Sequence, residues 1–328
     1  MTQPKEASHQ MNELGKARIP FLFIIDFQML QTIIIPLNEI DPHELCYSIN
    51  GFTNVPDKEM SPPGNIEFSF TSPDRKFYQN AFDKVMYHLK RGDSYLLNLT
   101  MPVNIETNLH LKQIFLLSKA RYKLWLNDQF TVFSPEPFVR IINGKIFSYP
   151  MKGTIDAGKP NAMNKLLNDE KELAEHYTIV DLIRNDLNRI AKNVRVDKFR
   201  YVEEIKTIHG CLLQTSSLIS GQLQDDYHEN IGDLMFQLLP AGSISGAPKK
   251  KTLEIIHEAE QYERGYYTGV FGYFNGTNLD CGVMIRFIEK QGNQLVFKAG
   301  GGITVNSDMD VEYNELINKV YLPFRSYE

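Results

Sequence analysis

One lysine in a segment punctuated by proline and glycine stands out for the chemistry that it could perform. Lys152 lies between Pro150 and Gly153, directly after a β-like run over residues 139–148. Because proline and glycine interrupt a strand, this pattern predicts a turn that leaves the lysine at the mouth of a loop. A neutral lysine amine is a nucleophile, which requires its pKa to fall from about 10.4 towards roughly 7 or 8.

Three carboxylates could supply acid–base chemistry or hold a metal. Glu136 follows a proline on a turn, Glu175 lies on a predicted helix, and Glu315 lies on another helix, four residues before Lys319. Two carboxylates that converge would suit Mg2+, which prefers oxygen ligands and keeps several waters. Each position also has a purely structural interpretation. Glu136 could cap its turn, and Glu175 could be a solvent-facing carboxylate. Glu315 could form an exposed ion pair with Lys319, which shares its helix face.

Two glycine-containing segments could bind an anion through backbone N–H groups, or could simply form tight turns. Gly242–Lys249 differs from a P-loop because Pro248 stands where the helix should begin, and Gly300–Gly302 does not extend to GxGxxG because Val305 occupies the final position. Both differences argue against nucleotide binding.

Arg286 is a charged residue within an apolar strand. It could be a charge on an edge strand, or it could bind a carboxylate group of a ligand.

Composition excludes several classes of protein. The 328 residues carry a net charge of -5 with interspersed signs, so no basic face favours nucleic acid. The apolar run over residues 19–27 is too short to span a membrane, and no signal peptide is evident. Three scattered cysteines predict neither a disulfide framework nor a zinc site. We expect a cytoplasmic protein.

The elements that must position these residues alternate in blocks. Residues 1–18 are polar, and we expect them to be frayed. Strands are expected over 21–36, 95–103, 139–148, 194–202, 212–222, 266–274, 279–288, 294–299 and 302–305. Helices are expected over 72–91, 109–120, 162–191, 231–239 and 249–261, and after a segment that resembles a capping box, Ser307–Asp310. This order predicts an α+β protein. We expect a short N-terminal region, 1–70, packed on a catalytic domain, 71–328.

The motifs follow one another in an order that resembles the chorismate-utilising enzymes. The segments that carry the resemblance are Gly92–Tyr95, Asn98-Leu99, Ser134–Glu136, Pro150–Thr154, Ala174–His176, Val180–Asp186, Ala241–Lys249, Ile285-Arg286 and Ala299–Ile303. The resemblance implies a four-layer α/β/β/α sandwich of two largely antiparallel sheets, with helices outside and the site between the sheets.

The resemblance also implies roles around the substrate, chorismate. Glu175 and Glu315 would hold Mg2+ at the ring carboxylate, which Lys319 and the backbone of Gly300, Gly301 and Gly302 would also face. Tyr267 and Arg286 would hold the enolpyruvyl carboxylate. His209 and Ser243 would lie near the departing C4 hydroxyl, which Glu136 would protonate as general acid.

The Pro-x-Lys-Gly-Thr form around Lys152 is similar to one branch, aminodeoxychorismate synthase component I. This implies amination of chorismate to 4-amino-4-deoxychorismate, for 4-aminobenzoate and folate, with Lys152 as nucleophile. A separate glutamine amidotransferase subunit would supply the ammonia. Anthranilate synthase component I, which usually carries alanine at this position, and a non-catalytic chorismate-binding paralogue are the alternatives. Two residues depart from the family pattern. Leu96 occupies a position where glutamine is common, and Phe287 occupies a position where threonine is usual.

Overall fold

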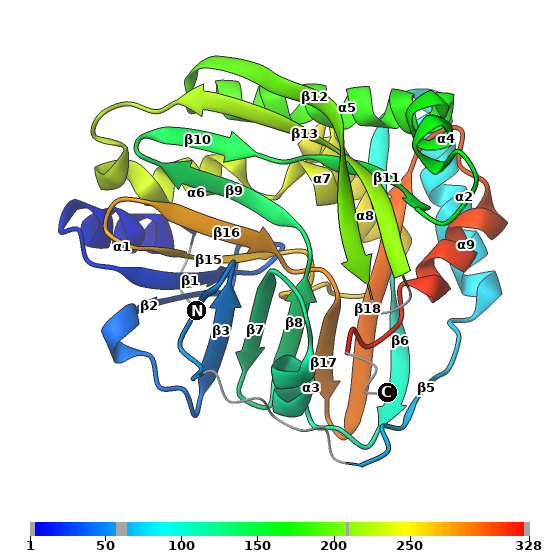
Figure 1. The fold of residues 1–328 in the computed structure, drawn as a ribbon, viewed down its shortest axis with the longest axis horizontal. Helices are drawn as coiled ribbons and strands as arrows, with labels where there is room; N and C mark the ends of the chain where they lie inside the picture. The colour runs from blue at the N-terminus through cyan, green and yellow to red at the C-terminus, as the bar shows by residue number, and fades with distance from the viewer. Residues whose placement is uncertain (1–3, 57–63, 208–209, 325–328) are drawn as a thin grey trace.

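Two nine-stranded antiparallel sheets form the centre of the computed structural model, which describes residues 4–56, 64–207 and 210–324 (Figure 1). Sheet A contains, in spatial order, β11 (Met151–Asp156), β13 (Gly210–Gln222), β10 (Lys145–Ser148), β9 (Pro137–Ile142), β16 (Leu279–Val283), β15 (Val270–Phe274), β1 (Phe21–Ile25) and β2 (Thr32–Pro36), with β12 (Lys192–Thr207) also paired to β13. Sheet B contains β14 (Gly246–Ala247), β6 (Leu96–Thr107), β18 (Gln294–Ile303), β17 (Phe287–Gln291), β8 (Phe130–Ser134), β7 (Tyr122–Leu126), β3 (Leu45–Ile49) and β4 (Phe52–Thr53), with β5 (Phe68–Phe70) paired to β6.

The two sheets pack face to face through an apolar layer. Leu22 and Ile24 of β1 join this layer, whereas Phe21, Phe23 and Ile25 of the same strand pack on the opposite face against helices. All five side chains are fully buried. Alternate side chains of a strand point to opposite faces, so an all-apolar strand is suited to a sheet that is covered on both sides.

Helices cover the outer face of each sheet. The helices on sheet A are α1 (Pro4–Lys16), α5 (Glu170–Asn188) and α6 (Ile231–Leu238), with α4 (Ala162–Asn168) against β11 and β13. The helices on sheet B are α2 (Arg75–Arg91), α3 (Leu111–Leu117), α8 (Lys249–Glu260) and α9 (Met309–Asn318). The short α7 (Gly242–Ser245) and two 3-10 turns, Leu37–Glu39 and Tyr227–Asn230, are the remaining helical elements of the described residues. The predicted four-layer α/β/β/α sandwich is confirmed.

Local capping signals define several helix ends. The Asp74 side chain accepts a hydrogen bond from the backbone N–H of Phe77 at the start of α2, and Gly92 ends that helix in a left-handed conformation with φ 79°. Asp308 caps α9 in the same manner as Asp74 caps α2. Such side chains satisfy N–H groups that have no partner within the helix, and glycine adopts positive φ without a steric penalty. The predicted end of α2 at Gly92 is confirmed. A cap does precede α9, but the capping residue is Asp308, whose side chain accepts from the N–H groups of Asp310 and Val311, in place of the predicted capping box.

The expectation of a frayed N-terminus is wrong for the described residues. Residues 4–16 form α1, in which Ala7 and Met11 are fully buried, and the Ser8 hydroxyl donates a hydrogen bond to Asp233 of α6 at 2.5 Å. At Gly232 of α6, a Cβ would lie 2.1 Å from the Ser8 carbonyl oxygen. Tertiary packing against α6 therefore stabilises a helix that its polar composition alone disfavours.

The single helix predicted over residues 162–191 is two helices. Asp169 is extended, and its side chain accepts a hydrogen bond from the Glu172 N–H at 2.9 Å, which starts α5 separately from α4. The expected strands over 294–299 and 302–305 are instead one strand, β18, which contains the three glycines. The first error arises because the apolar pattern continues across the cap between α4 and α5. The second arises because glycines interrupt the apolar pattern of β18.

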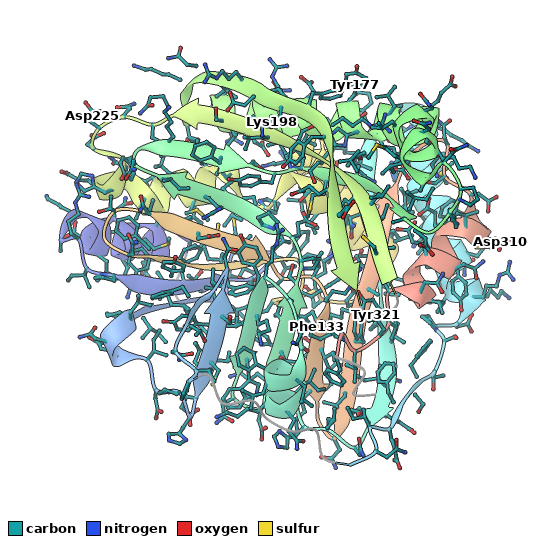
Figure 2. All side chains as sticks on the ribbon, in the orientation of Figure 1. Phe133, Tyr177, Lys198, Asp225, Asp310 and Tyr321 are labelled. Atoms are coloured by element: carbon teal, nitrogen blue, oxygen red, sulfur yellow. The ribbon has the colours of Figure 1, made fainter. Side chains whose placement is uncertain are left out.

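The interior is apolar and the rim is polar. Figure 2 shows Asp225 and Asp310 at the edge of the molecule, whereas Phe133 is 2% exposed. Strands β1 to β4, from the first 53 residues, are hydrogen-bonded into the two sheets rather than separate from them. Within the described ranges, no helix has the length and apolar character needed to cross a membrane.

Candidate active site

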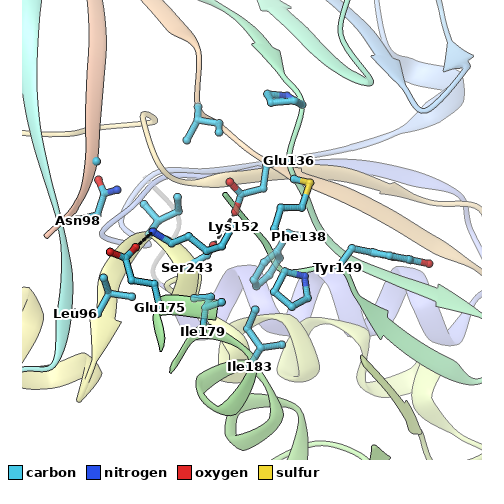
Figure 3. A pocket seen from close by; sticks show the side chains of 18 of the residues that line it. Leu96, Asn98, Glu136, Phe138, Tyr149, Lys152, Glu175, Ile179, Ile183 and Ser243 are labelled. Carbon is cyan, nitrogen blue, oxygen red and sulfur yellow. Dashed lines mark hydrogen bonds and ion pairs between the residues drawn. The ribbon is translucent and has the colours of Figure 1, made fainter. Parts of the chain in front are cut away.

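A cavity of about 490 Å³ lies between the two sheets, bounded by β9 and β11 on one side and by β6, β18 and α9 on the other. Figure 3 shows part of its lining. The predicted site residues that line it are Glu136, Lys152, Glu175, Ser243, Tyr267, Arg286, Gly300, Gly301, Gly302, Glu315 and Lys319. His209, the remaining predicted site residue, lies outside the described residues.

Glu136 and Arg286 each lie where the chain crosses from one sheet to the other. Glu136 lies between β8 of sheet B and β9 of sheet A, and Arg286 lies between β16 of sheet A and β17 of sheet B. The crossings are hydrogen-bonded to each other: the Val283 N–H donates to the Glu136 carbonyl and the Phe133 N–H donates to the Arg286 carbonyl, both at 3.1 Å. The backbone at both residues is therefore fixed by sheets A and B together.

Glu136 is half-buried and is held by a hydroxyl group. The Ser243 Oγ of α7 donates a hydrogen bond to Glu136 Oε1 at 2.8 Å. Burial raises the pKa of Glu136 above its ordinary range, although Ser243 and nearby cations, among them Arg286, oppose the rise. A carboxyl group in such an environment retains a proton more readily than one in water, which suits a general acid.

Lys152 forms an ion pair with Glu175 inside the cavity. Lys152 Nζ lies 2.6 Å from Glu175 Oε2, and the side chains are 25% and 11% exposed (Figure 3). Burial alone would lower the pKa of Lys152, but the carboxylates of Glu175, Glu172 and Glu315 together outweigh burial and the pKa is raised. In this arrangement the amine is charged, so the lowered pKa expected of a nucleophile is not what the protein alone produces.

The predicted turn at Lys152 is also wrong, because the residue lies within β11. Lys152 pairs with Thr215 of β13, and a bulge follows it at Gly153, whose φ is 76°. A Cβ at Gly153 would lie 3.2 Å from Glu172 Oε2. Glycine thus produces a bulge, which re-aims the strand without ending it, instead of the expected turn.

Helix α9 places one ion pair over the glycine strand. Lys319 Nζ lies 2.6 Å from Glu315 Oε1 and donates a hydrogen bond to the Gly300 carbonyl at 2.8 Å. Burial lowers the pKa of Lys319 despite this partner, whereas Lys319 lowers the pKa of Glu315 despite burial. The spacing alone suggested a solvated ion pair on one helix. Because Lys319 also donates a hydrogen bond to β18, the ion pair instead connects α9 to the sheet.

Four of the carboxylates that line the cavity form two pairs, and the sequence predicted only one member of each pair. Glu172 and Glu175 come from α5, and Glu312 and Glu315 come from α9. Glu172 and Glu312 were not predicted. Each lies three residues before a predicted carboxylate and so shares its helix face, and this spacing is the sequence signal that could have identified them. Burial raises the pKa of both missed carboxyl groups.

The oxygen donors fit Mg2+ in type. In the described part of the chain, no three acidic, histidine or cysteine side chains are close enough together to form a ready-made metal site. Mg2+ commonly takes one or two carboxylates and completes its shell with water and substrate. Glu175 and Glu315 could serve in this way, but each is paired with a lysine in the structure, so a metal would compete with Lys152 and Lys319.

A cationic group and a phenol line the inner wall. Arg286 Nε is buried and has no hydrogen-bond partner within the described ranges. Tyr267 is 3% exposed, and burial raises the pKa of its phenol, which therefore stays neutral. An unsatisfied guanidinium N–H beside a neutral phenol could bind the carboxylate of a ligand.

The two departures from the family pattern have different environments. Leu96 lines the cavity, close to the inner face of Gly302. Phe287 is fully buried in the layer between the sheets and stacks on Phe130 at 4.9 Å between ring centroids. Leu96 therefore shapes the site, whereas Phe287 contributes to core packing.

Comparison with known proteins agrees with this geometry. A family model for chorismate binding enzymes matches residues 34–325. An uncharacterized PabA-like protein of Pasteurella multocida (strain Pm70) is 51% identical over 314 residues, which cover 96% of this chain and 97% of that protein. Aminodeoxychorismate synthase component 1 of Bacillus subtilis (strain 168) is 32% identical over 289 residues, which cover 84% and 60%. Anthranilate synthase component 1 of Acetivibrio thermocellus is 33% identical over 261 residues, which cover 75% and 51%.

Solved structures share the fold. MenF, the menaquinone-specific isochorismate synthase from Escherichia coli, superposes with a TM-score of 0.74 at 16% identity, covering 97% of this chain and 81% of that one. At this identity the likeness concerns the fold alone. The family model matches nearly the whole chain, and the residues of its motifs line one cavity between the sheets. The chain therefore belongs to the family of chorismate-binding enzymes.

Proposed function

We propose that this chain acts as component I of an aminodeoxychorismate synthase, which converts chorismate and ammonia to 4-amino-4-deoxychorismate. The observation that carries the proposal is the Lys152 amine inside the cavity, 2.6 Å from Glu175. The relationship to aminodeoxychorismate synthases supports it. Those relatives are named as one component of a synthase, so we infer that a separate glutamine amidotransferase subunit supplies the ammonia.

Anthranilate synthase component I is the second candidate, because a relative of that name is 33% identical to this chain. Lys152 is the residue that favours amination at C4 over this alternative, because the Pro-x-Lys-Gly-Thr form resembles the aminodeoxychorismate branch. A non-catalytic paralogue is disfavoured because Glu136, Lys152 and two carboxylate pairs all line the same cavity.

The cavity offers a cationic partner for each carboxylate of chorismate. Arg286, with Tyr267, would bind the enolpyruvyl carboxylate through its unsatisfied Nε–H. Lys319 and the backbone of Gly300–Gly302 would face the ring carboxylate. Mg2+ held by Glu175 and Glu315 would, when bound, neutralise part of the charge on that ring carboxylate.

In the first proposed step, Lys152 attacks C2 of chorismate. The lone pair of the neutral amine forms the C2–N bond, the two ring double bonds shift, and the C4–O bond breaks. Glu136 gives its proton to the departing hydroxyl, which leaves as water. The adduct nitrogen is then a secondary ammonium, and Glu136 is a carboxylate.

In the second proposed step, ammonia displaces the lysine. The ammonia lone pair attacks C4, the double bonds shift back, and the C2–N bond breaks, so that Lys152 leaves as a neutral amine. The new C4 ammonium gives a proton to the Glu136 carboxylate. Both residues return to their starting states, and the net reaction is chorismate plus ammonia to product plus water. Splitting the substitution in this way replaces one difficult displacement by two easier ones.

The proposed cycle requires Lys152 to lose a proton before it attacks. Its pKa is raised in the structure because Glu175, with Glu172 and Glu315, stabilises the charged amine more than burial opposes it. Any group that draws Glu175 away from Lys152 would remove the main part of this stabilisation and so lower the pKa of the amine.

The proposal is tested by product analysis and by trapping the adduct. With chorismate, Mg2+ and an ammonium salt, the wild type should form 4-amino-4-deoxychorismate, which an added lyase converts to 4-aminobenzoate; anthranilate would favour the second candidate. With chorismate and no ammonia, the Lys152 peptide should gain the mass of chorismate less water. Lys152→Ala should lose at least about 10²-fold in rate, or about 2.7 kcal/mol of barrier.

The matched control is Lys165→Ala, which removes an exposed lysine from α4. This variant should keep wild-type turnover and still form the Lys152 adduct. Near-normal amination by Lys152→Ala would refute the covalent route. Metal dependence is checked in the same assay: excess EDTA should abolish turnover and added Mg2+ restore it, whereas full turnover in EDTA would contradict the metal assignment.

A further inference from the structure

Asn98 carries an unsatisfied acceptor into the cavity. It lies on β6 and lines the cavity, and its Oδ1 atom is buried with no hydrogen-bond partner among the residues that the structure describes. The carboxylates nearby are partnered, since Glu136 accepts from Ser243, and Glu175 and Glu315 bind lysines. A buried acceptor without a partner is costly to the protein and is therefore most often explained by a ligand, a water or a catalytic role.

The strand register places Asn98 next to the proposed nucleophile. Asn98 pairs with Gly302 of β18, and a Cβ at Gly302 would lie 3.5 Å from Lys152 Nζ. In Figure 3, Asn98 lies on the side of the cavity where Lys152 meets Glu175, away from Tyr149. The unsatisfied carbonyl therefore lies beside the amine that would be exchanged for ammonia.

A buried ion pair holds the backbone of Asn98 in place. Arg264 Nη2 donates a hydrogen bond to the Asn98 carbonyl oxygen at 2.7 Å and lies 2.5 Å from Glu260 Oε1. The same Glu260 oxygen accepts from the Thr100 N–H at 2.8 Å. The Arg264 and Glu260 side chains are 2% and 1% exposed. With β6 fixed on both sides of Leu99, the side chain of Asn98 stays directed at the cavity.

We propose that Asn98 Oδ1 accepts a hydrogen bond from the ammonia that attacks C4, which directs the ammonia lone pair towards the substrate. This inference rests on the proposed function and names the residue that positions its second substrate. Ammonia has three N–H donors and one lone pair, so an acceptor is the group that orients it. Chorismate carboxylates are themselves acceptors and cannot satisfy Asn98.

A neutral acceptor suits this task better than a carboxylate. A carboxylate would stabilise ammonium, which has no lone pair and cannot attack carbon. An amide oxygen is neutral and holds ammonia without that bias. The side chain thereby selects the reactive form of the second substrate.

The test compares the two proposed steps in Asn98→Ala. Its kcat/KM for ammonia should fall by about tenfold, the loss expected for one hydrogen bond. The KM for chorismate and the rate of Lys152 adduct formation without ammonia should not change. Asn98→Ser, which retains a shorter acceptor, should recover part of the loss. The control, Asn104→Ala, changes an exposed asparagine of the same strand and should behave as wild type.

Each outcome decides the proposal. An unchanged kcat/KM for ammonia in Asn98→Ala would overturn it. Slower adduct formation or a raised KM for chorismate would also overturn it, because Asn98 would then contact chorismate or support the fold. If the wild type forms no adduct and no aminated product, the proposed function fails as well. Adduct formation by Asn98→Ala at the wild-type rate separates these cases and shows that the variant is folded.

Discussion

Two half-buried lysines have pKa values shifted in opposite directions by their surroundings. Lys152 faces the carboxylate of Glu175, which raises its pKa in spite of burial. Lys123 donates hydrogen bonds to the carbonyl oxygens of Phe115, at 3.2 Å, and Ser118, at 3.0 Å, at the end of α3. Burial lowers the pKa of Lys123 to about 8. The carboxylates around Lys152 together outweigh desolvation, whereas the carbonyl dipoles around Lys123 do not.

The pKa of Lys123 predicts a specific dependence of stability on pH. In the unfolded chain its pKa returns to about 10.4, so between about pH 8 and 10 the unfolded state binds more protons. The free energy of unfolding should therefore rise with pH across this window, by up to roughly 3 kcal/mol for this group. Lys123→Met lacks the ionisation, so its stability relative to wild type should fall as pH increases.

Urea unfolding of both proteins at about pH 7.5 and about pH 9.5 measures this difference. Lys165→Met, at an exposed position on α4, is the control and should follow the wild type at both pH values. Equal pH slopes for wild type and Lys123→Met would show that Lys123 is not desolvated in the folded protein.

At the scale of elements, β18 and α9 together form one wall of the site. A Cβ at Gly300 would lie 2.3 Å from the Leu99 carbonyl oxygen of β6. A Cβ at Gly301 would face α9 instead, 3.5 Å from Lys319 Nζ, 3.6 Å from Glu312 and 3.7 Å from Glu315. Neighbouring glycines therefore serve different purposes: Gly300 permits strand pairing, and Gly301 leaves room among the charged side chains.

This difference predicts contrasting effects of alanine at the two positions. Gly301→Ala should unfold at the wild-type temperature, because its methyl group makes ordinary contacts, but should lose about tenfold in kcat/KM for chorismate. Gly300→Ala should be destabilised by more than about 1 kcal/mol, because the β6 backbone must move. Thermal unfolding and steady-state kinetics of both variants provide the measurement. Full activity in Gly301→Ala would show that this space is not used by substrate or metal.

At the scale of the whole molecule, a buried polar cluster joins the two sheets. Asp280 of sheet A accepts hydrogen bonds from the Tyr122 hydroxyl of sheet B at 2.8 Å and from Asn50 at 3.2 Å, and lies 2.9 Å from Arg140 Nε. Asp280 is 5% exposed. The cluster lies in an otherwise apolar layer, where a lost partner leaves a buried charge less well compensated.

Tyr122→Phe should lower the free energy of unfolding by about 1.5–3 kcal/mol, the range for hydrogen bonds to charged groups. The aromatic ring remains, so the m-value should be unchanged. Tyr273→Phe is the control, because no hydrogen bond of the Tyr273 hydroxyl occurs within the described ranges and its ring stacks on Phe52. Urea unfolding measures both variants, and an equal effect would show that the cluster does not stabilise sheet packing.

The sequence by itself determined the features that depend on local pattern. Gly92 and the residues before α9 mark helix ends because caps act within a few residues, and the Phe- and Ile-rich run over residues 21–36 predicts strands. The order of motifs predicted the family and the four-layer fold. The same order predicted the residues of one cavity, except for His209, which lies outside the described residues, and their individual catalytic roles stay predictions.

Only the tertiary structure decided how distant residues meet. It placed Lys152 on a bulged strand against Glu175, brought the crossings at Glu136 and Arg286 together, and left Asn98 with an unsatisfied acceptor. It also made α1 a packed helix. These outcomes depend on contacts between residues far apart in sequence, where burial and neighbouring charge set each pKa. Spacing along the chain identifies which residue types are available, but the energies that govern them arise between elements.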